Sequence, residues 1–253
     1  MAYNVEKIHP YNTAESKREQ VSHMFDAIAP NYDKLNGVLS MGIDKYWRRE
    51  AMKVLYRFRP KHVLDIATGT GDFAILAAKI ARPDQVIGID ISDGMMQIGR
   101  QKVEKQGLND VISFEKQDCA NLRFPDNTFD AAIAAFGVRN FEDIDTSFRE
   151  ILRVLRPGGV FLFLELSTPE KKPIKQLYEV YSDYVMPLMA DLLATEKRAY
   201  EYLPESIAAF PQGKEMMQIL KKNRFTKIRL RRLTLGICTM YIAEKPIEKG
   251  LKY

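Results

Sequence analysis

The sequence predicts an α/β fold, a Rossmann-like and mostly parallel sheet of seven strands with helices on both faces. Between residues 61 and 169, short apolar runs alternate with helical stretches, which is typical of strand-helix-strand units. A turn with two glycines follows the first run, and the nearly continuous apolar run over 160–166 is typical of a strand buried on both faces. A chain of 253 residues that is 46% hydrophobic has enough apolar side chains for such a core.

The middle section supplies strands and helices in alternation. The predicted strands cover residues 62–66, 85–90, 111–118, 129–136 and 160–166. The predicted helices cover 73–81, 94–106 and 142–155, and Pro157, Gly158 and Gly159 end the last of them. Ligands of parallel sheets bind beyond the carboxyl ends of the strands, so the residues that end each strand are the candidate site.

The flanking sections complete the fold. Residues 14–58 contain two helical patterns, residues 171–222 look helical, and the β-like runs 227–235 and 238–244 predict a hairpin that closes the sheet. We therefore expect a single domain over residues 1–253. Its parts are a helical lid (1–60), a ligand-binding core (61–169), a helical insertion on the substrate side (170–224) and a terminal β-hairpin (225–253).

Composition argues against several classes of protein. No apolar run approaches the ~20 residues of a membrane span, and the N-terminus lacks the apolar segment of a secretory signal, so we expect a cytoplasmic protein. Cys119 and Cys238 lack metal-ligand spacing. With His9, His23 and His62 as the only histidines, a zinc site or a Ser-His-Asp triad is hard to assemble, and we expect no metal.

The turn after the first strand is the best candidate for a cofactor site. Its glycines Gly69 and Gly71 allow a ligand to approach the backbone closely. Read as Gly69-x-Gly71-x-x-Ala74, with Asp90 at the end of the next strand, the turn satisfies the dinucleotide fingerprint. The motif alone does not separate NAD from other nucleoside cofactors, so an NAD-dependent oxidoreductase remains an alternative.

The charges near this turn favour a cationic ligand. Residues 61–169 carry a net charge of −4, between flanks of +3 and +6. Asp65 lies in the first strand, Asp72 ends the turn and Asp118 closes the third strand. A carboxylate where a pyrophosphate must rest is unfavourable, and no phosphate-binding Arg or Lys accompanies the row. These residues suit a phosphate-free cationic nucleoside, S-adenosylmethionine.

Several motifs resemble those of a known family. Asp65-x-Ala67-x-Gly69-x-Gly71 is similar to the first motif of class I S-adenosylmethionine-dependent methyltransferases. Other segments resemble signatures of the quinone C-methyltransferases of menaquinone and ubiquinone biosynthesis: Tyr32–Asn36 with Leu39, Ser40 and Trp47, then Phe136–Asn140, Arg153–Gly159 with Glu165 and Ser167, and Tyr202–Ser206. The resemblance extends from about residue 20 to the C-terminus.

This resemblance implies methylation of a ring carbon in a polyprenylated hydroquinone. Demethylmenaquinol is the expected substrate and menaquinol the product, with a benzoquinol of the ubiquinone pathway as the open alternative. The family's cofactor contacts fall on Thr70, Asp90, Asp118 and Cys119. The chain departs from the family pattern where His, Lys, Asn and Ser are common, at Asp44, Arg156, Asp118 and Ala135.

Catalysis requires a group that stabilises the phenolate as the ring hydroxyl loses its proton. Arg139, beside Asn140 just after the fourth strand, is the first candidate, and Tyr32 is expected on a lid over the ring. Two structural alternatives remain open: Arg139 could form an ion pair with Glu142 or Asp143, and Glu165 could be a satisfied buried carboxylate rather than a base.

The last open questions concern partners. A set of apolar residues is either core or a tunnel for the polyprenyl chain: Tyr178, Tyr181, Tyr184, Met186 and Met189. A basic cluster is a solvated face, a surface for anionic lipid or, in an RNA methyltransferase, a phosphate contact: Lys221, Lys222, Arg224, Lys227, Arg229, Arg231 and Arg232. We expect peripheral membrane binding and no nucleic acid, and a homodimer is an open expectation.

Overall fold

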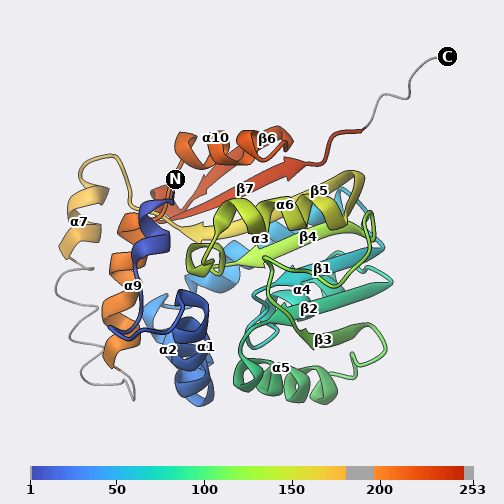
Figure 1. Ribbon diagram of the computed structural model, residues 1–253, viewed down its shortest axis with the longest axis horizontal. Helices are drawn as coiled ribbons and strands as arrows, with labels where there is room; N and C mark the ends of the chain where they lie inside the picture. Colours follow the sequence, from blue (N-terminus) through green and yellow to red (C-terminus); the bar gives the residue numbers. More distant parts are fainter. Residues whose placement is uncertain (1, 181–196, 248–253) are drawn as a thin grey trace.

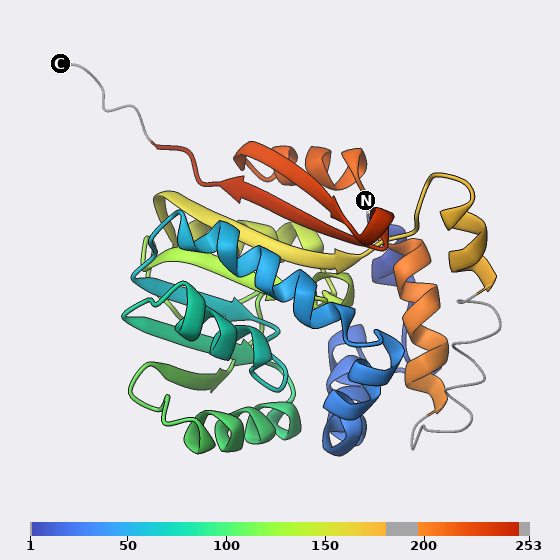
Figure 2. The ribbon, with the colours of Figure 1, turned by 180° about the vertical axis from the view of Figure 1, so that it is seen from behind.

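The computed structural model describes residues 2–180 and 197–247 (Figure 1). These residues form a seven-stranded sheet with the strand order β3-β2-β1-β4-β5-β7-β6. Helices cover both faces of the sheet, as Figure 1 and the opposite view in Figure 2 show. The predicted Rossmann-like α/β fold is therefore confirmed.

The parallel part of the sheet consists of β1 (His62–Ile66), β2 (Gln85–Asp90), β3 (Ile112–Lys116), β4 (Phe129–Ala135) and β5 (Leu155–Leu166). The first two strands have the predicted bounds, whereas β3 ends two residues before Asp118. In β1 and β2, Ile66 pairs with Ile89, so the two strands end side by side. The carboxyl ends of the parallel strands thus meet at one edge, where the candidate residues were expected.

A hairpin completes the sheet, as predicted. β6 (Thr226–Leu233) pairs antiparallel with β7 (Cys238–Glu244), and β7 pairs antiparallel with β5. A short 3-10 turn over Thr234–Gly236 connects the two strands.

The core has two layers because successive side chains of a strand point to opposite faces. α3 (Ile43–Tyr56), α4 (Asp72–Ile80) and α5 (Asp93–Lys105) pack on one face, whose buried side chains include Leu162 of β5. α6 (Ile144–Val154) and α10 (Lys214–Lys222) pack on the other face against Phe163. Figure 2 shows α3 lying across its face of the sheet.

The N-terminal section contains three α-helices where the periodicity indicated two. They are α1 (Lys17–Ile28), α2 (Tyr32–Leu39) and α3. Pro30 lies between the first two in a short 3-10 turn, and Gly42, with a φ of +73°, separates the last two. A left-handed residue cannot continue an α-helix, so the pattern is divided there. α1 and α2 stand beyond the carboxyl ends of the strands (Figure 1).

The insertion after β5 contains α7 (Ile174–Val180) and α9 (Lys197–Ala209) before α10. α9 stands beside α1 and α2 (Figure 1). Of the residues considered for a polyprenyl tunnel, Tyr181, Tyr184, Met186 and Met189 lie outside the described residues. Within the described part of the chain, no helix is long and apolar enough to cross a membrane.

Candidate active site

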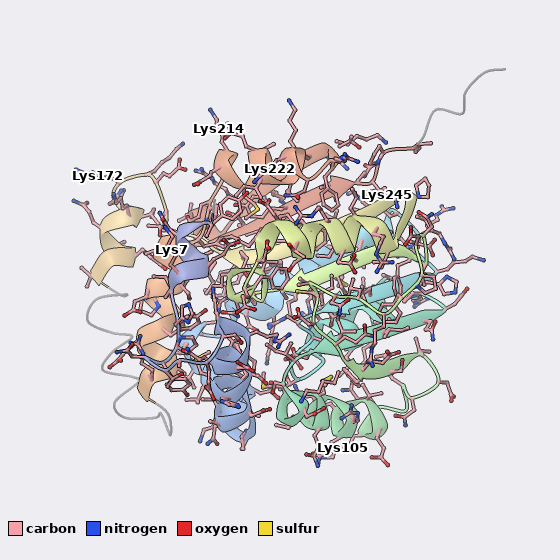
Figure 3. The ribbon with its side chains drawn as sticks, in the orientation of Figure 1. Lys7, Lys105, Lys172, Lys214, Lys222 and Lys245 are labelled. Carbon is pink, nitrogen blue, oxygen red and sulfur yellow. The ribbon has the colours of Figure 1, made fainter. Side chains whose placement is uncertain are left out.

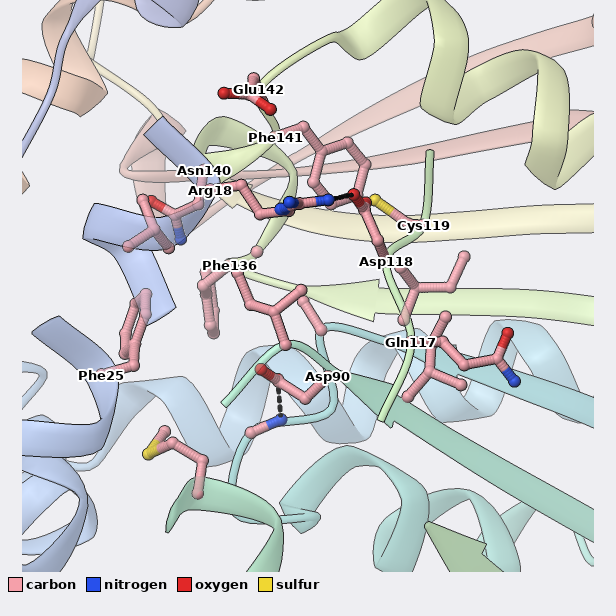
Figure 4. Close-up of a pocket in the computed structure, with 18 of the residues that line it drawn as sticks. Arg18, Phe25, Asp90, Gln117, Asp118, Cys119, Phe136, Asn140, Phe141 and Glu142 are labelled. Atoms are coloured by element: carbon pink, nitrogen blue, oxygen red, sulfur yellow. Dashed lines mark hydrogen bonds and ion pairs between the residues drawn. The ribbon is translucent and has the colours of Figure 1, made fainter. Parts of the chain in front are cut away.

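A cavity of about 760 Å³, including its open mouth, lies at the carboxyl ends of the strands, and we call it the Asp90 cavity. Figure 4 shows its walls, which come from the ends of β1, β2 and β4, from the segment after β3 and from α1. Of the predicted site residues, the following line it: Tyr32, Gly69, Asp90, Asp118, Cys119 and Asn140.

The β1–α4 turn forms one wall through Gly69, whereas the predicted site residue Gly71 is not among the residues that line the cavity. Gly69 and Gly71 have φ values of +56° and +77°, in the left-handed region that favours glycine. A Cβ atom on Gly71 would lie 2.8 Å from the Phe114 ring. The backbone N–H of Gly69 donates to Asp90 Oδ2 at 2.8 Å, and that of Ser92 donates to Oδ1 at 2.9 Å. Asp90 is thereby fixed against the turn, and burial raises its pKa.

Asp65 lies behind the same turn and is fully buried. The Thr68 hydroxyl donates to its Oδ2 at 2.6 Å, while Oδ1 has no hydrogen-bond partner in the described structure. Burial raises the pKa of Asp65 to about 7. A carboxylate oxygen left without a partner in the interior is costly, so this atom is suited to a cationic ligand. Asp65 lines a second cavity of about 320 Å³, the Asp65 cavity, together with Tyr32, Arg48 and Thr70.

Thr70 connects the turn to helix α2. Its hydroxyl donates to Asp33 Oδ1 at 2.7 Å and accepts a hydrogen bond from Lys102 Nζ at 2.9 Å. Lys102 also contacts Asp33 and Asp72, each at 2.6 Å. We expected no phosphate-binding Arg or Lys beside the row of carboxylates, but Lys102 lies there and is paired with Asp33 and Asp72. Lys102 comes from the outer helix α5, too far along the chain for a motif to reveal.

Asp118 and Cys119 lie in the segment just after β3. Asp118 Oδ2 pairs with Arg18 of α1 at 3.2 Å (Figure 4), and its Oδ1 accepts the N–H of Ala120 at 2.9 Å. The Cys119 thiol donates to the Ser147 hydroxyl at 3.3 Å, and burial raises its pKa. Cys119 is therefore a neutral wall of the cavity and not a nucleophile.

Arg139 is 7% exposed and lies in a 3-10 turn, Val138–Asn140, after β4. Its ion pair is with Glu165 of β5, at 3.1 Å, and its backbone N–H donates to the same carboxylate at 3.1 Å. The expected pairing with Glu142 or Asp143 was wrong, because β4 and β5 run side by side and bring Glu165 to the turn. The Glu165 carboxylate is buried, paired and hydrogen-bonded, which agrees with the structural alternative to its role as a base.

Arg139 lines a third cavity, of about 710 Å³, which we call the Arg139 cavity. Tyr32 lines the Asp90, Asp65 and Arg139 cavities, so its ring lies where they converge. Burial raises the pKa of Tyr32. Asn140 lines the Asp90 cavity, and its Oδ1 accepts a hydrogen bond from the Tyr202 hydroxyl at 3.2 Å.

Arg48 also lies at the site, although no motif in the sequence indicated it. Arg48 lines both the Asp65 cavity and the Arg139 cavity. It forms a buried ion pair with Asp44, whose other oxygen accepts the Ser40 hydroxyl at 2.7 Å. The signal available in the sequence was Asp44 itself, which stands where the family signature commonly has His.

Comparison with known proteins agrees with the geometry. The model of the ubiE/COQ5 methyltransferase family matches residues 13–245. The chain belongs to this family. It is 52% identical to a demethylmenaquinone methyltransferase of Bacteroides fragilis, over 97% of this chain and 100% of the relative. It is 40% identical to a ubiquinone/menaquinone biosynthesis C-methyltransferase of Geobacter sulfurreducens, over 97% of this chain and 94% of the relative.

Solved structures agree on the fold. A SAM-dependent methyltransferase from Thermotoga maritima superposes with a TM-score of 0.58 at 16% identity, covering 88% of this chain and 99% of that one. The protein is a methyltransferase, and its cofactor is S-adenosylmethionine. An NAD-dependent oxidoreductase has no support from these relatives.

The residues of this chain fit that cofactor. The unpartnered Oδ1 of Asp65 and the nearby Asp90 provide acceptors for an ammonium group and for ribose hydroxyls. Gly69 lines both the Asp90 cavity and the Asp65 cavity without a side chain, so a ligand can approach the backbone closely there. Asp90, Asp118 and Cys119 line one cavity, as the predicted ribose and adenine contacts require. When bound, S-adenosylmethionine supplies an electrophilic methyl group on sulfur.

Proposed function

We propose that this methyltransferase methylates a ring carbon of polyprenylated demethylmenaquinol and so forms menaquinol. The single observation that carries the proposal is the position of the Arg139 cavity. This cavity shares Tyr32 and Phe136 with the Asp90 cavity, so the two cavities adjoin, and this supports an acceptor site beside the cofactor site. The names of the relatives in Bacteroides fragilis and Geobacter sulfurreducens support the same acceptor class.

The lining of the Arg139 cavity suits an aromatic ring with polar substituents. Leu39, Trp47, Leu166 and Ile207 provide apolar walls, while Arg139 provides a cation. Buried polar groups placed in an apolar pocket fix the orientation of a ligand. A hydroquinone has this combination of an apolar ring and hydroxyl groups.

Each protein group then has a defined task. The Arg139 guanidinium stabilises the phenolate oxygen as the ring hydroxyl loses its proton, directly or through water, while Asn140 keeps its place beside it. Tyr32 and the lid helices exclude water from the junction of the cavities. The ring carbon would form its new bond to the methyl group as the bond from methyl to sulfur breaks, which leaves S-adenosylhomocysteine. The ring proton would then pass to water and the ring oxygen would regain a proton, so that the aromatic hydroquinone is restored and one proton is released overall. Alignment of the two reactants supplies much of the acceleration.

The polyprenyl chain requires an apolar path away from the ring. A further cavity, of about 490 Å³, adjoins the Arg139 cavity, with which it shares Tyr32, Leu39 and Arg139. The walls that it does not share are mostly apolar: Met24, Phe25, Ile28, Leu35, Ala199 and Tyr202. We propose this cavity between α1, α2 and α9 as the start of the polyprenyl path.

We propose that the protein acts in the cytoplasm, bound peripherally to the membrane that holds its substrate. Exposed apolar side chains near the acceptor cavities support this proposal. Val38 and Met41 flank the lining residue Leu39, and Leu177 and Val180 project from α7. Lys172 lies beside α7, away from the sheet (Figure 3), where it could meet anionic lipid.

The C-terminal basic cluster supports neither RNA nor strong lipid binding. Lys222 pairs with Asp145, Arg231 with Glu50 and Arg232 with Glu170. Lys227 and Arg229 share Glu244. Figure 3 shows Lys214 and Lys222 on α10, across the sheet from α3. Carboxylates neutralise most of this surface, so a solvated face is the better interpretation.

For the organisation of the chain we propose a single domain over 1–253. Residues 1–60 form a lid, residues 61–169 bind the cofactor, residues 170–224 contribute to the substrate side and residues 225–253 close the sheet. A homodimer is tested separately by light scattering.

The test incubates the purified protein with methyl-labelled S-adenosylmethionine and a short-chain demethylmenaquinol under reducing conditions. We expect labelled menaquinol, and its absence from a folded, cofactor-binding protein would refute the proposal. An equimolar mixture with the matching benzoquinol decides between the two rings. Preferential labelling of the benzoquinol would favour the ubiquinone pathway.

A further inference from the structure

The Asp65 cavity is lined by a positively charged side chain, Arg48, that has no role in the proposed methylation. Among the described residues that line this cavity, Arg48 is the one with a positive charge, and its side chain is 10% exposed. One of its terminal nitrogens pairs with Asp44, and its carbon Cζ lies 5.1 Å from the centre of the Phe136 ring. Its Nε atom is buried and has no hydrogen-bond partner. A buried N–H without an acceptor is costly and calls for a ligand.

The Asp65 carboxylate in the same cavity also has an oxygen atom without a hydrogen-bond partner. Asp65 lines the cavity with Arg48, and its Oδ1 has no partner either. A guanidinium whose Nε has no acceptor and a carboxylate whose Oδ1 has no donor line the same small cavity. Together they match a zwitterion with an ammonium and a carboxylate group. The amino-acid end of S-adenosylmethionine is such a zwitterion.

The Asp65 and Asp90 cavities adjoin, so the amino-acid end of S-adenosylmethionine can reach Asp65 while its nucleoside lies at Asp90. The Asp65 cavity shares Tyr32, Ala67, Gly69 and Ala135 with the Asp90 cavity, where the predicted adenosine contacts lie. A ligand with its nucleoside against Asp90 can therefore pass the glycine turn and reach Asp65 with its other end.

We propose that Arg48 of helix α3 binds the α-carboxylate of S-adenosylmethionine through its buried guanidinium. The planar guanidinium offers several fixed N–H donors, so it can keep Asp44 and still bind a second carboxylate. This inference rests on the cofactor of the family and is independent of the quinol acceptor.

Lys102 is the competing cation near the turn, and it is already engaged. It contacts Asp33, Asp72 and the Thr70 hydroxyl at 2.6 to 2.9 Å. These contacts use the three N–H donors of an ammonium group. Arg48, in contrast, retains a donor without an acceptor.

A consequence follows for the order of binding. Arg48 also lines the Arg139 cavity, so a bound carboxylate fixes a side chain that walls the acceptor site. We therefore expect the cofactor to bind before the quinol and to tighten the binding of a quinol analogue.

The experiment compares two ligands that differ by one group. Calorimetry measures the binding of S-adenosylmethionine and of its decarboxylated form to the wild type and to Arg48→Gln. We expect Arg48→Gln to weaken S-adenosylmethionine about 10- to 100-fold and to change the affinity of the decarboxylated form by less than about twofold. Arg49→Gln, an exposed neighbour on α3, is the matched control and should change neither.

Equal losses for both ligands would show that Arg48 acts only on the structure of the lid, and no loss for either would also overturn the proposal. If Arg48→Gln unfolds in a thermal melt, Arg48→Lys replaces it. Lysine keeps the positive charge but lacks the planar set of N–H donors. Arg48→Lys should therefore bind S-adenosylmethionine about tenfold more weakly, with little change for the decarboxylated form. Because binding is measured without a quinol, this test can fail while the proposed methylation holds, and the reverse is also true.

Discussion

Arg139 and Glu165 meet at the buried ends of two neighbouring strands, with the guanidinium 3.1 Å from the carboxylate. The Glu165 carboxylate also accepts the backbone N–H of Arg139, so it fixes both the main chain and the side chain of the proposed oxyanion partner. Nε of Arg139 has no partner in the described structure. The pair thus holds a cation in an apolar cavity while leaving it a free donor.

Replacing Arg139 with lysine should impair catalysis without impairing cofactor binding. Arg139 lines the acceptor cavity but not the Asp65 or Asp90 cavity. Lysine keeps a charge but loses the fixed donors, and losing one oxyanion donor costs roughly 10²- to 10³-fold in kcat. Steady-state kinetics and calorimetry on Arg139→Lys test this expectation. A changed Kd for S-adenosylmethionine with an unchanged kcat would contradict the assignment.

Glu165→Gln should destabilise the fold. The side chain of Glu165 is 1% exposed. Glutamine has no negative charge, so the substitution leaves the buried Arg139 guanidinium without a counter-ion. Breaking a buried pair from one side costs about 3–5 kcal/mol. Urea unfolding measures the loss. Glu170→Gln, which breaks the exposed pair with Arg232, is the control and should lose far less. Similar losses in the two variants would argue against a tightly buried pair.

Gly71→Ala should lower stability and cofactor affinity by more than the cost of a left-handed alanine alone. Gly71 has a left-handed φ, which costs alanine about 1–2 kcal/mol, and the new Cβ would lie 2.8 Å from the Phe114 ring. Gly107→Ala is the matched control, because Gly107 also has a left-handed φ but no atom near the added Cβ. Thermal unfolding and S-adenosylmethionine titration should show a larger loss for Gly71→Ala. Equal losses in the two variants would mean that backbone strain alone, and not the contact with Phe114, lowers stability.

Affinity for S-adenosylmethionine should rise with pH up to about 7 and then level off. Burial raises the pKa of Asp65 to about 7, so below that pH its carboxyl is protonated and must release a proton to bind an ammonium group. Affinity should fall up to tenfold per pH unit on the acidic side. Arg48 and Asp90 are the charged neighbours that act on this titration.

Calorimetry between pH 5.5 and 8.5 tests the profile, with Asp65→Asn as the control that should bind more weakly and lose this slope. The same shift affects the unliganded fold in the opposite direction. Because the folded protein holds this proton more tightly than the unfolded chain, the unfolding free energy should decrease as pH rises from about 4 to about 7. An unchanged slope in Asp65→Asn would assign the pH dependence to another group.

The sequence predicted the sheet and its ligand-binding edge because those features are local. β1 and β2 are apolar runs bounded by polar residues and turns, and the glycines that end β1 are visible at once. The hairpin followed from two β-like runs around Gly236. These patterns depend on neighbouring residues, so a single sequence contains them.

The rest of the site depends on distant contacts. Arg48, Arg18 and Lys102 reach the cofactor edge from helices that pack there only in the folded chain. The pairing of Arg139 with Glu165 depends on the register of β4 against β5, and no local motif reports that register. For the same reason, the nearer acidic residues Glu142 and Asp143 were plausible partners in the sequence and wrong in the structure.

The most direct test of the central claim is the mass of the lipid quinones in cells that lack this gene. We predict that demethylmenaquinone accumulates in place of menaquinone, that wild-type protein restores menaquinone, and that Arg139→Lys restores it poorly. A normal menaquinone pool in the deleted cells, or accumulation of an unmethylated benzoquinone instead, would contradict the account.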